Sequence, residues 1–203
     1  MNQSVIQGYA DAAGELIRRY EAISCAEMYT VVAHLFPKKG GRLIDLGAGT
    51  GRDAAWFAAR GFEVVAVEPV AEFRTAGVSL HRSKRIAWLN DTLPDLALTL
   101  QNGETFDIVL VSGVWQHLDT QQRRIAMPNL AALAAPGGLV IMSLRHGPGV
   151  PERPCFPIPV DATIELAAAN GLELVFRESA QSIQAHNRAA GVTWTWLAFT
   201  PAV

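Results

Sequence analysis

Cysteine is scarce in this sequence of 203 residues, and neither cysteine stands in a spacing typical of metal sites or disulfides. Cys25 and Cys155 lie far apart and form no C-x-x-C pair. The five histidines are dispersed as well, so we expect no metal ion. Isolated thiols are typical of proteins kept in a reducing compartment, which favours a cytoplasmic location.

Long apolar stretches and basic clusters are missing too. No run of about 18 apolar residues is free of charged or turn residues, which argues against a transmembrane helix, and the polar start 1–4 does not resemble a signal peptide. The net charge is −2, and the largest basic groupings are pairs such as Lys38-Lys39. Because a phosphate backbone usually requires a basic face, we expect neither nucleic acid nor a membrane as a partner.

What is present has the composition of an ordinary globular domain. Half of the residues are hydrophobic and 18% are charged, and this length can form a full core without disulfides. Apolar residues at helical spacing between Val5 and Tyr20 predict one helix. A capping-box pattern at 24–27 predicts a second helix, which Pro37 ends. Residues 1–40 are therefore expected to form a helical prefix.

From Arg42 onwards, short apolar runs alternate with helical patterns, which is typical of a parallel sheet covered by helices on both faces. The expected strands are 43–46, 63–67, 85–89, 106–111, 139–144, 172–176 and 192–199. The expected helices are 53–60, 71–79, a short one near 95–100, 120–134 and 161–170. Pro128 predicts a kink or a break within 120–134. No convincing helix separates the last two strands, so we expect them to pair antiparallel, as a hairpin with a long loop.

The most informative segment is a strand that runs into a glycine-rich turn and then a helix, over residues 43–51. Its glycines allow close backbone approach to a ligand and positive φ angles. Glu68, at the end of the second strand, is placed to accept hydrogen bonds from both hydroxyls of a ribose. The spacing G-x-G-x-G, with Asp45 two residues before it, disfavours a pyrophosphate and suits an ammonium group. A tight turn beside a surface glutamate is the simpler alternative.

This segment resembles the first motif of the class I S-adenosylmethionine-dependent methyltransferases, D/E-x-G-x-G-x-G. The resemblance runs from about residue 9 to 200, because 106–110 with 115–118 resembles the fourth-strand motif and 133–139 the turn before the fifth strand. It implies an α/β fold with a doubly wound, mostly parallel, Rossmann-like sheet of seven strands in the order 3-2-1-4-5-7-6 and an antiparallel last strand. It also implies a single methyltransferase domain over 1–203, with a helical lid (1–40), a cofactor-binding core (41–145) and an acceptor side (146–203) that holds a loop, a helix and the C-terminal hairpin.

The resemblance assigns roles to individual residues. S-adenosylmethionine is the implied cofactor, with Glu68 at its ribose and Asp91 at its adenine amino group. The implied cofactor-binding residues are Asp45, Gly47, Gly49, Gly51, Glu68, Asp91, Thr92, Ser112 and Tyr20. Tyr9 and Tyr20 lie on the prefix that folds over the cofactor in similar enzymes, although helix packing explains both equally well.

Candidates for the chemistry follow the fourth and fifth strands, because ligands of open α/β sheets bind beyond the carboxyl ends of the strands. His117 is the candidate catalytic base or acceptor-positioning group, with packing as the stronger alternative. Trp115 is a candidate acceptor wall or adenine cover, and core packing competes equally. Arg145 could bind an acidic acceptor group or form a structural ion pair. His146 begins a loop rich in glycine and proline and is the third candidate substrate contact.

Three functions remain open from the sequence. The favoured one is methyl transfer to a small-molecule acceptor by a monomer or homodimer. The segment 112–115 lacks the Asn/Asp-Pro-Pro-aromatic pattern of enzymes that methylate amino groups of nucleic acids and proteins. A non-catalytic module that binds S-adenosylmethionine or S-adenosylhomocysteine is the second, and an NAD-linked oxidoreductase is the third and weakest. The acceptor, and the atom that is methylated, are left open.

Overall fold

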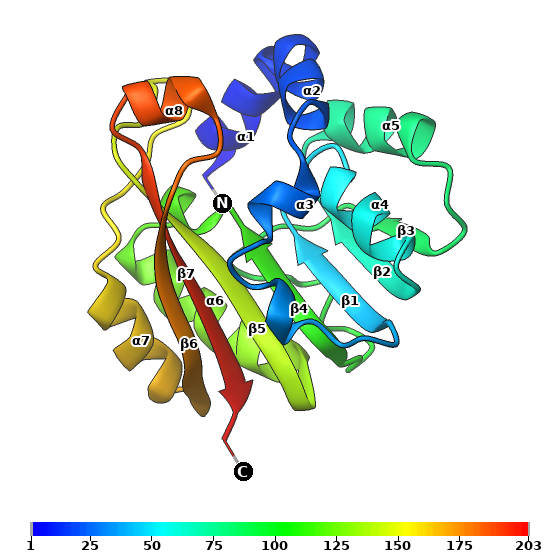
Figure 1. Ribbon diagram of the computed structural model, residues 1–203, viewed down its shortest axis with the longest axis vertical. Helices are drawn as coiled ribbons and strands as arrows, with labels where there is room; N and C mark the ends of the chain where they lie inside the picture. Colours follow the sequence, from blue (N-terminus) through cyan, green and yellow to red (C-terminus); the bar gives the residue numbers. More distant parts are fainter. Residues whose placement is uncertain (1, 203) are drawn as a thin grey trace.

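The computed structural model describes residues 2–202 and contains one sheet of seven strands in the order β3-β2-β1-β4-β5-β7-β6 (Figure 1). Strands β1 to β5 are parallel to one another, and β7 runs antiparallel to both β5 and β6. The predicted fold class and strand order are therefore confirmed. The strands are β1 (Gly41–Leu46), β2 (Phe62–Val67), β3 (Ile86–Leu89), β4 (Phe106–Ser112), β5 (Ala134–His146), β6 (Leu172–Gln181) and β7 (Thr193–Pro201).

Helices cover both faces of the sheet, which explains why its central strands consist of nearly continuous apolar residues. The helices are α1 (Gln3–Asp11), α2 (Ala13–Glu21), α3 (Cys25–Met28), α4 (Arg52–Ala58), α5 (Ala71–Leu80), α6 (Thr120–Leu133), α7 (Val160–Ala168) and α8 (Ala185–Ala189), with 3-10 turns η1 (Ala33–Leu35) and η2 (Trp115–His117). One apolar core lies between the sheet and α6 and α7, and another between the sheet and α3, η1 and α4. None of the helices in residues 2–202 is long and apolar enough to cross a membrane.

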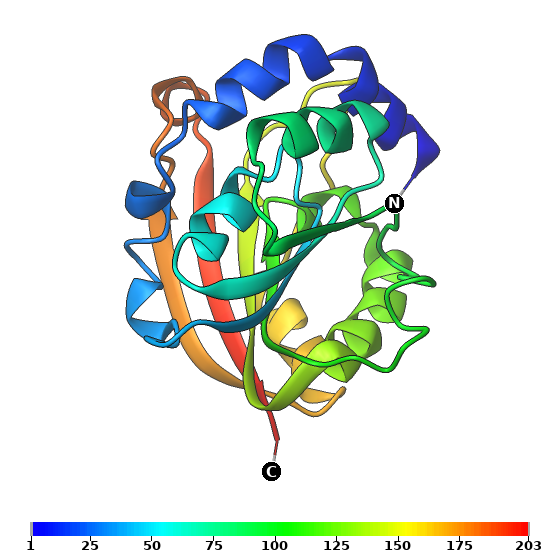
Figure 2. The same ribbon diagram turned by 90° about the vertical axis from the view of Figure 1, so that its right-hand side faces the viewer.

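Helices α1 and α2 lie across the carboxyl ends of the parallel strands, beside α5 (Figures 1 and 2). The single helix predicted up to Tyr20 is wrong, because the chain leaves helical geometry at Ala12 and starts again at Ala13. Leu16 packs against Val70 and Phe73 in a small third core that joins the prefix to α5. This contact holds the prefix over the strand ends.

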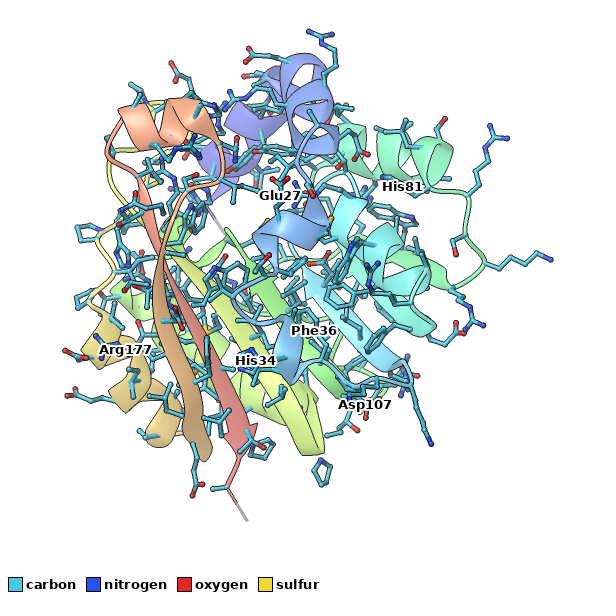
Figure 3. All side chains as sticks on the ribbon, in the orientation of Figure 1. Glu27, His34, Phe36, His81, Asp107 and Arg177 are labelled. Atoms are coloured by element: carbon cyan, nitrogen blue, oxygen red, sulfur yellow. The ribbon has the colours of Figure 1, made fainter. Side chains whose placement is uncertain are left out.

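The second predicted helix is also shorter than expected. Ser24 caps the start of α3 as predicted, its hydroxyl accepting from the N–H of Glu27, but α3 ends at Met28, and η1 follows only at Ala33. Tyr29 is fully buried among aromatic rings that include Phe36 and Phe57, and this packing competes with continued helix. Figure 3 shows His34 of η1 and Phe36, which follows it, in front of the sheet.

Three further predictions about helices are corrected. Residues 95–100 form turns, because Asp91 accepts hydrogen bonds from the backbone N–H groups of Leu98 and Thr99 and so organises a loop. Pro128 does not break α6, which runs from its predicted capping box at Asp119 to Leu133. The last two strands pair antiparallel as expected, but the short helix α8 lies between them.

Candidate functional site

A cavity of about 480 Å³ opens at the carboxyl ends of β1, β2, β4 and β5. This volume falls in the usual range for small-molecule sites. Helices α1 and α2 cover it from one side and α8 from another, so it lies where the sequence predicted a site (Figure 1). Its walls combine the glycine turn after β1 with a second, more basic group of side chains after β4 and β5.

The glycine turn forms one wall. Gly47 and Gly49 have φ angles of 80° and 55°, in the left-handed region that glycine adopts without strain. Gly49 faces open space, since a Cβ there would meet only Tyr20, at 3.9 Å. Gly47, Gly49 and Tyr20, which were expected to bind the cofactor, all line the cavity, and their contact with a cofactor stays a prediction. Gly51 does not, and its missing Cβ instead leaves room for the ring of Trp88.

Glu68 stands at the same wall, directly after β2. Its Oε2 accepts a hydrogen bond from the N–H of Gly49 at 2.7 Å, and its Oε1 accepts one from the N–H of Val70 at 2.8 Å. Burial raises the pKa of Glu68 to about 7, although both N–H groups and Arg74 act in the opposite direction. A carboxylate has about four acceptor positions, so two backbone bonds leave capacity for two donors from a ligand.

Asp45 lies behind this wall and not in it. The side chain is 2% exposed, and its Oδ2 has no hydrogen-bond partner among the described residues. Burial raises the pKa of Asp45, and the nearby carboxylate of Asp53 raises it further. Arg52 lies 2.7 Å from Asp53 in an ion pair, and these two residues line the cavity although the sequence did not single them out.

Asp91 and Thr92 line a smaller pocket that adjoins the large cavity and shares Gly47 and Val114 with it. Both carboxylate oxygens of Asp91 are engaged by its own loop, through the N–H of Thr92 and the N–H and hydroxyl of Thr99. The predicted contact of Asp91 with an adenine amino group stays a prediction.

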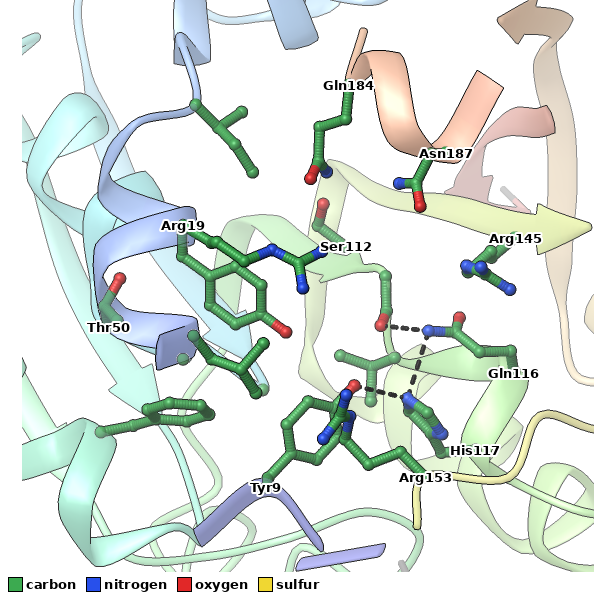
Figure 4. Close-up of a pocket in the computed structure, with 18 of the residues that line it drawn as sticks. Tyr9, Arg19, Thr50, Ser112, Gln116, His117, Arg145, Arg153, Gln184 and Asn187 are labelled. Carbon is green, nitrogen blue, oxygen red and sulfur yellow. Dashed lines mark hydrogen bonds between the residues drawn. The ribbon is translucent and has the colours of Figure 1, made fainter. Parts of the chain in front are cut away.

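His117 lies in η2 on the opposite side of the cavity, where it is held at both ring nitrogens (Figure 4). Its Nδ1 is 2.9 Å from the carbonyl oxygen of Pro154, so Nδ1 carries the proton and donates it. Its Nε2 then accepts from the Tyr9 hydroxyl, at 2.8 Å. Burial lowers the pKa of His117, and Arg145 and Arg153 lower it further. The imidazole is therefore neutral near pH 7, with Nε2 as its basic atom.

Two predicted substrate contacts do not line the cavity. Trp115 is fully buried in the core beneath η2, so its predicted role as a wall or cover is wrong and the packing alternative holds. His146 turns to β7, where its Nε2 lies 2.9 Å from Thr195 Oγ1. Ser112, an expected cofactor contact, does line the cavity.

Four arginines line the cavity, Arg19, Arg52, Arg145 and Arg153, of which the sequence singled out only Arg145. Arg153 comes from the glycine- and proline-rich loop, donates to the carbonyl of Gly8 at 3.2 Å and lies over the Tyr9 ring at 5.3 Å. Arg19, on α2, lies 2.6 Å from His186 Nε2 on α8. No local motif marks Arg19 or Arg153, because they reach the cavity only through the fold. In residues 2–202, no cluster of three or more His, Cys, Asp or Glu side chains could hold a metal ion.

Comparison with known proteins gives the chain a family context. The family described as methyltransferase domain matches residues 14–199. An uncharacterized methyltransferase of Mycobacterium tuberculosis is 32% identical over 111 residues, which are 51% of this chain and 40% of that protein. An uncharacterized methyltransferase of Alkaliphilus oremlandii is 24% identical over 135 residues, or 64% of this chain and 55% of that one. The chain thus spans about half the length of these curated relatives.

Solved structures share the fold at low sequence identity. A 1,6-didemethyltoxoflavin-N1-methyltransferase of Burkholderia thailandensis, with 1,6-didemethyltoxoflavin and S-adenosylhomocysteine bound, has a TM-score of 0.75 at 20% identity, covering 98% of this chain and 88% of that one. A TehB-like SAM-dependent methyltransferase of Corynebacterium glutamicum has a TM-score of 0.67 at 17% identity and covers 98% of this chain and 100% of that one. These likenesses establish a common architecture.

Proposed function

The chain belongs to the family of methyltransferase domains, and from that premise we propose that it transfers a methyl group from S-adenosylmethionine to a small-molecule acceptor. One observation carries the proposal. Glu68 and the positive-φ glycines Gly47 and Gly49 line the same cavity, at the ends of neighbouring strands. An adenosyl ligand needs this combination, because a carboxylate binds the ribose hydroxyls while exposed backbone accommodates the rest of the ligand closely.

The other residues of this wall have complementary tasks. Glu68 accepts from both ribose hydroxyls, and its bonds from Gly49 and Val70 keep the carboxylate oriented for them. Behind the glycine turn, the unpartnered Oδ2 of Asp45 is an acceptor for the ammonium group of the methionine moiety. Asp91 and Thr92 lie beside Gly47, on the side of the cavity toward which the adenine end points, while Tyr20 and Ser112 bound the large cavity.

When bound, S-adenosylmethionine supplies a methyl group whose bond to sulfur breaks as its bond to the acceptor atom forms, leaving S-adenosylhomocysteine. The chain mainly positions the partners and excludes water. An acceptor that carries a proton also needs a base. Tyr9 and His117 provide one in series, since the Tyr9 oxygen takes the proton of the acceptor as its own proton passes to His117 Nε2. The carbonyl of Pro154 holds the opposite nitrogen and stabilises the imidazolium that results.

The enclosure of the cavity supports a small acceptor. Residues from α1, α2, α8 and the loop around Arg153 all contribute to its walls, and a site of this volume is suited to a molecule of drug-like size. The Burkholderia thailandensis neighbour holds a small heterocycle together with S-adenosylhomocysteine. By the same proposal, the acceptor of this chain binds between the cofactor at Glu68 and the base at His117.

Calorimetric titration with S-adenosylmethionine, S-adenosylhomocysteine and NAD tests the proposal. Micromolar affinity for both adenosyl ligands, about −8 kcal/mol, with no binding of NAD, is the expected result. Binding of NAD alone would replace the proposal with a dinucleotide site. Transfer of labelled methyl groups to members of an acceptor library then separates an enzyme from a module that binds the cofactor without turnover.

A further inference from the structure

The acceptor side of the cavity carries positive charge that the protein itself does not neutralise. Arg145 and Arg153 line it, and in residues 2–202 neither forms an ion pair with a carboxylate. Arg145 has only a 3.3 Å bond to the carbonyl of Gly147 and a 3.9 Å contact with Cys155 Sγ. Arg52, at the glycine turn, is paired with Asp53 instead.

Both arginines are half-buried and not free in solvent. A guanidinium presents five donors in a planar fork that matches the oxygens of a carboxylate or phosphate. The bonds recorded for Arg145 and Arg153 involve one terminal nitrogen each, so most of their donors are left for a ligand. The positive charges of both arginines also act on His117, and they lower its pKa.

The sheet separates this charge from the cofactor end. Glu68 follows β2 and Arg145 lies at the end of β5, with β1 and β4 between them. Three strand spacings of about 4.8 Å put roughly 14 Å between these two strand ends. Figure 4 shows Thr50 of the glycine turn on one side of the cavity and Gln116, His117 and Arg145 on the other. An anion at Arg145 is therefore closer to the proton acceptor than to the ribose site.

We propose that the acceptor is a small molecule with an anionic oxygen group, a carboxylate or a phosphate, which Arg145 and Arg153 bind together. This rests on the proposed function and specifies its substrate class. The amide side chains of Asn187 on α8 and of Gln184, its N-cap residue, line the cavity and add neutral donors (Figure 4). Binding the anion there directs the rest of the acceptor past Tyr9 and His117.

The test uses benzoate and inorganic phosphate as probes, titrated into protein that is saturated with S-adenosylhomocysteine. We expect at least one probe to bind with a dissociation constant of about 1–10 mM. Arg145→Gln and Arg153→Gln should each weaken it by about tenfold or more, as loss of a charged hydrogen bond does. Arg124→Gln removes the same charge from an exposed position on α6 and should leave binding unchanged. Which of the two probes binds identifies the anion as carboxylate or phosphate.

Two results would overturn the proposal. One is the absence of saturable binding of both probes to the wild-type protein, or binding that the two variants leave unchanged. The other concerns the carboxylate of the cofactor itself. If the variants weaken S-adenosylhomocysteine about tenfold but leave 5′-deoxy-5′-methylthioadenosine unchanged, the arginines bind the amino-acid end of the cofactor. Failure of the wild-type protein to bind S-adenosylhomocysteine at all would instead reject the proposed function.

Discussion

The hydroxyl of Tyr9 lies 2.8 Å from His117 Nε2, although 108 positions separate the two residues in the chain. Tyr9 belongs to α1 and His117 to the turn after β4, so this contact forms only when the helical prefix lies over the strand ends. The bond joins the cover of the cavity to the group that we propose as the base. The position of the helical prefix over the cavity and the hydrogen bonding of the proposed base therefore depend on the same hydrogen bond.

Replacing Tyr9 by phenylalanine tests this pair. Tyr9→Phe removes the hydroxyl from between the acceptor and His117, so kcat for a proton-bearing acceptor should fall about 100-fold, in the range of general acid–base effects. Affinity for S-adenosylhomocysteine, measured by calorimetry, should stay within about twofold. Tyr29→Phe is the matched control, because its buried hydroxyl has no partner in the described chain and lies outside the cavity. Equal losses in both variants would reject the relay.

The protonation of His117 gives a second prediction. Because burial and the two arginines lower its pKa below 6.5, nitrogen NMR should find Nδ1 protonated and Nε2 unprotonated at pH 7. Arg145→Gln removes a positive charge, so the pKa should move upward. In the unfolded state the histidine has a pKa of about 6.5, so as the pH falls it takes up a proton before the folded state does. His117 therefore contributes stability above pH 6.5, and this contribution is lost as the pH falls through the lowered pKa of the folded state. A pKa at or above 6.5 in the wild-type protein would contradict this account.

Glu68 predicts a pH dependence of binding. Its pKa is about 7 in the free protein, and ribose hydroxyls donate best to the ionised carboxylate. The affinity for 5′-deoxy-5′-methylthioadenosine, which has no amino-acid group of its own, should therefore increase from about pH 6 to pH 8. The stability of the protein without ligand should change in the opposite direction. Because the pKa of Glu68 is raised by folding, the free energy of unfolding falls as the pH rises from 4.5 through about 7.

Glu68→Gln is the variant for this titration. It keeps one acceptor oxygen and loses the charge, so affinity should fall about tenfold and the rise between pH 6 and pH 8 should disappear. If the variant keeps the full pH dependence, another group controls the titration, and Asp45 is the next to examine because its pKa is raised as well.

Most of the fold was predictable because the sheet is determined by local patterns. Apolar runs, or alternation in the case of the last strand, indicate all seven strands, and the glycine turn and Glu68 lie within one βαβ unit, where the sequence itself places them together. The predictions that the structure corrects concern helices whose local helical preference is overridden by side chains distant in the sequence. Tyr29 packs among rings from α4 and ends a helical segment early, and the carboxylate of Asp91 converts a predicted helix into a loop.

The sequence anticipates the glycine wall of the cavity and, on the opposite wall, His117 and Arg145 but not Arg19 or Arg153. Gly47, Gly49 and Glu68 line the cavity because a motif sets their spacing. The opposite side depends on contacts between segments that no motif connects, such as that of Arg153 with Gly8 on α1. Trp115 was misplaced for a related reason, since the η2 turn directs its ring into the core while His117, two positions later, faces the cavity.

Alanine substitutions at two glycines distinguish the effect of backbone strain on stability from the effect of an added Cβ on ligand binding. Gly49 and Gly103 have φ angles of 55° and 59°, so alanine at either position should cost about 1–2 kcal/mol of stability. A Cβ at Gly103 meets nothing within 4 Å, whereas a Cβ at Gly49 projects where the cavity opens. Gly49→Ala alone should weaken S-adenosylhomocysteine by tenfold or more. Equal affinity in the two variants would remove Gly49 from the binding site.

The last prediction concerns Arg123, which holds the loop that positions His117. Its guanidinium, on α6, is buried and donates to the carbonyl oxygens of Trp115, Phe156 and Pro157, at 3.4, 3.4 and 2.8 Å. These bonds fix residues 154–157 against η2, and the carbonyl of Pro154 in turn fixes the tautomer of His117.

Arg123→Met keeps the aliphatic part of the side chain and removes its donors, so the carbonyl oxygens of Trp115, Phe156 and Pro157 lose their bonds from the guanidinium. The free energy of unfolding, measured with denaturant, should fall by about 2–4 kcal/mol. Because Pro154 is released as well, kcat should fall more than the affinity for S-adenosylhomocysteine. Arg124→Met makes the same substitution at an exposed position of α6 and should change stability by less than about 0.5 kcal/mol. If the two variants are equally stable, the three bonds of Arg123 are not what holds the loop, and the position of His117 must depend on Tyr9 and the α1 cover instead.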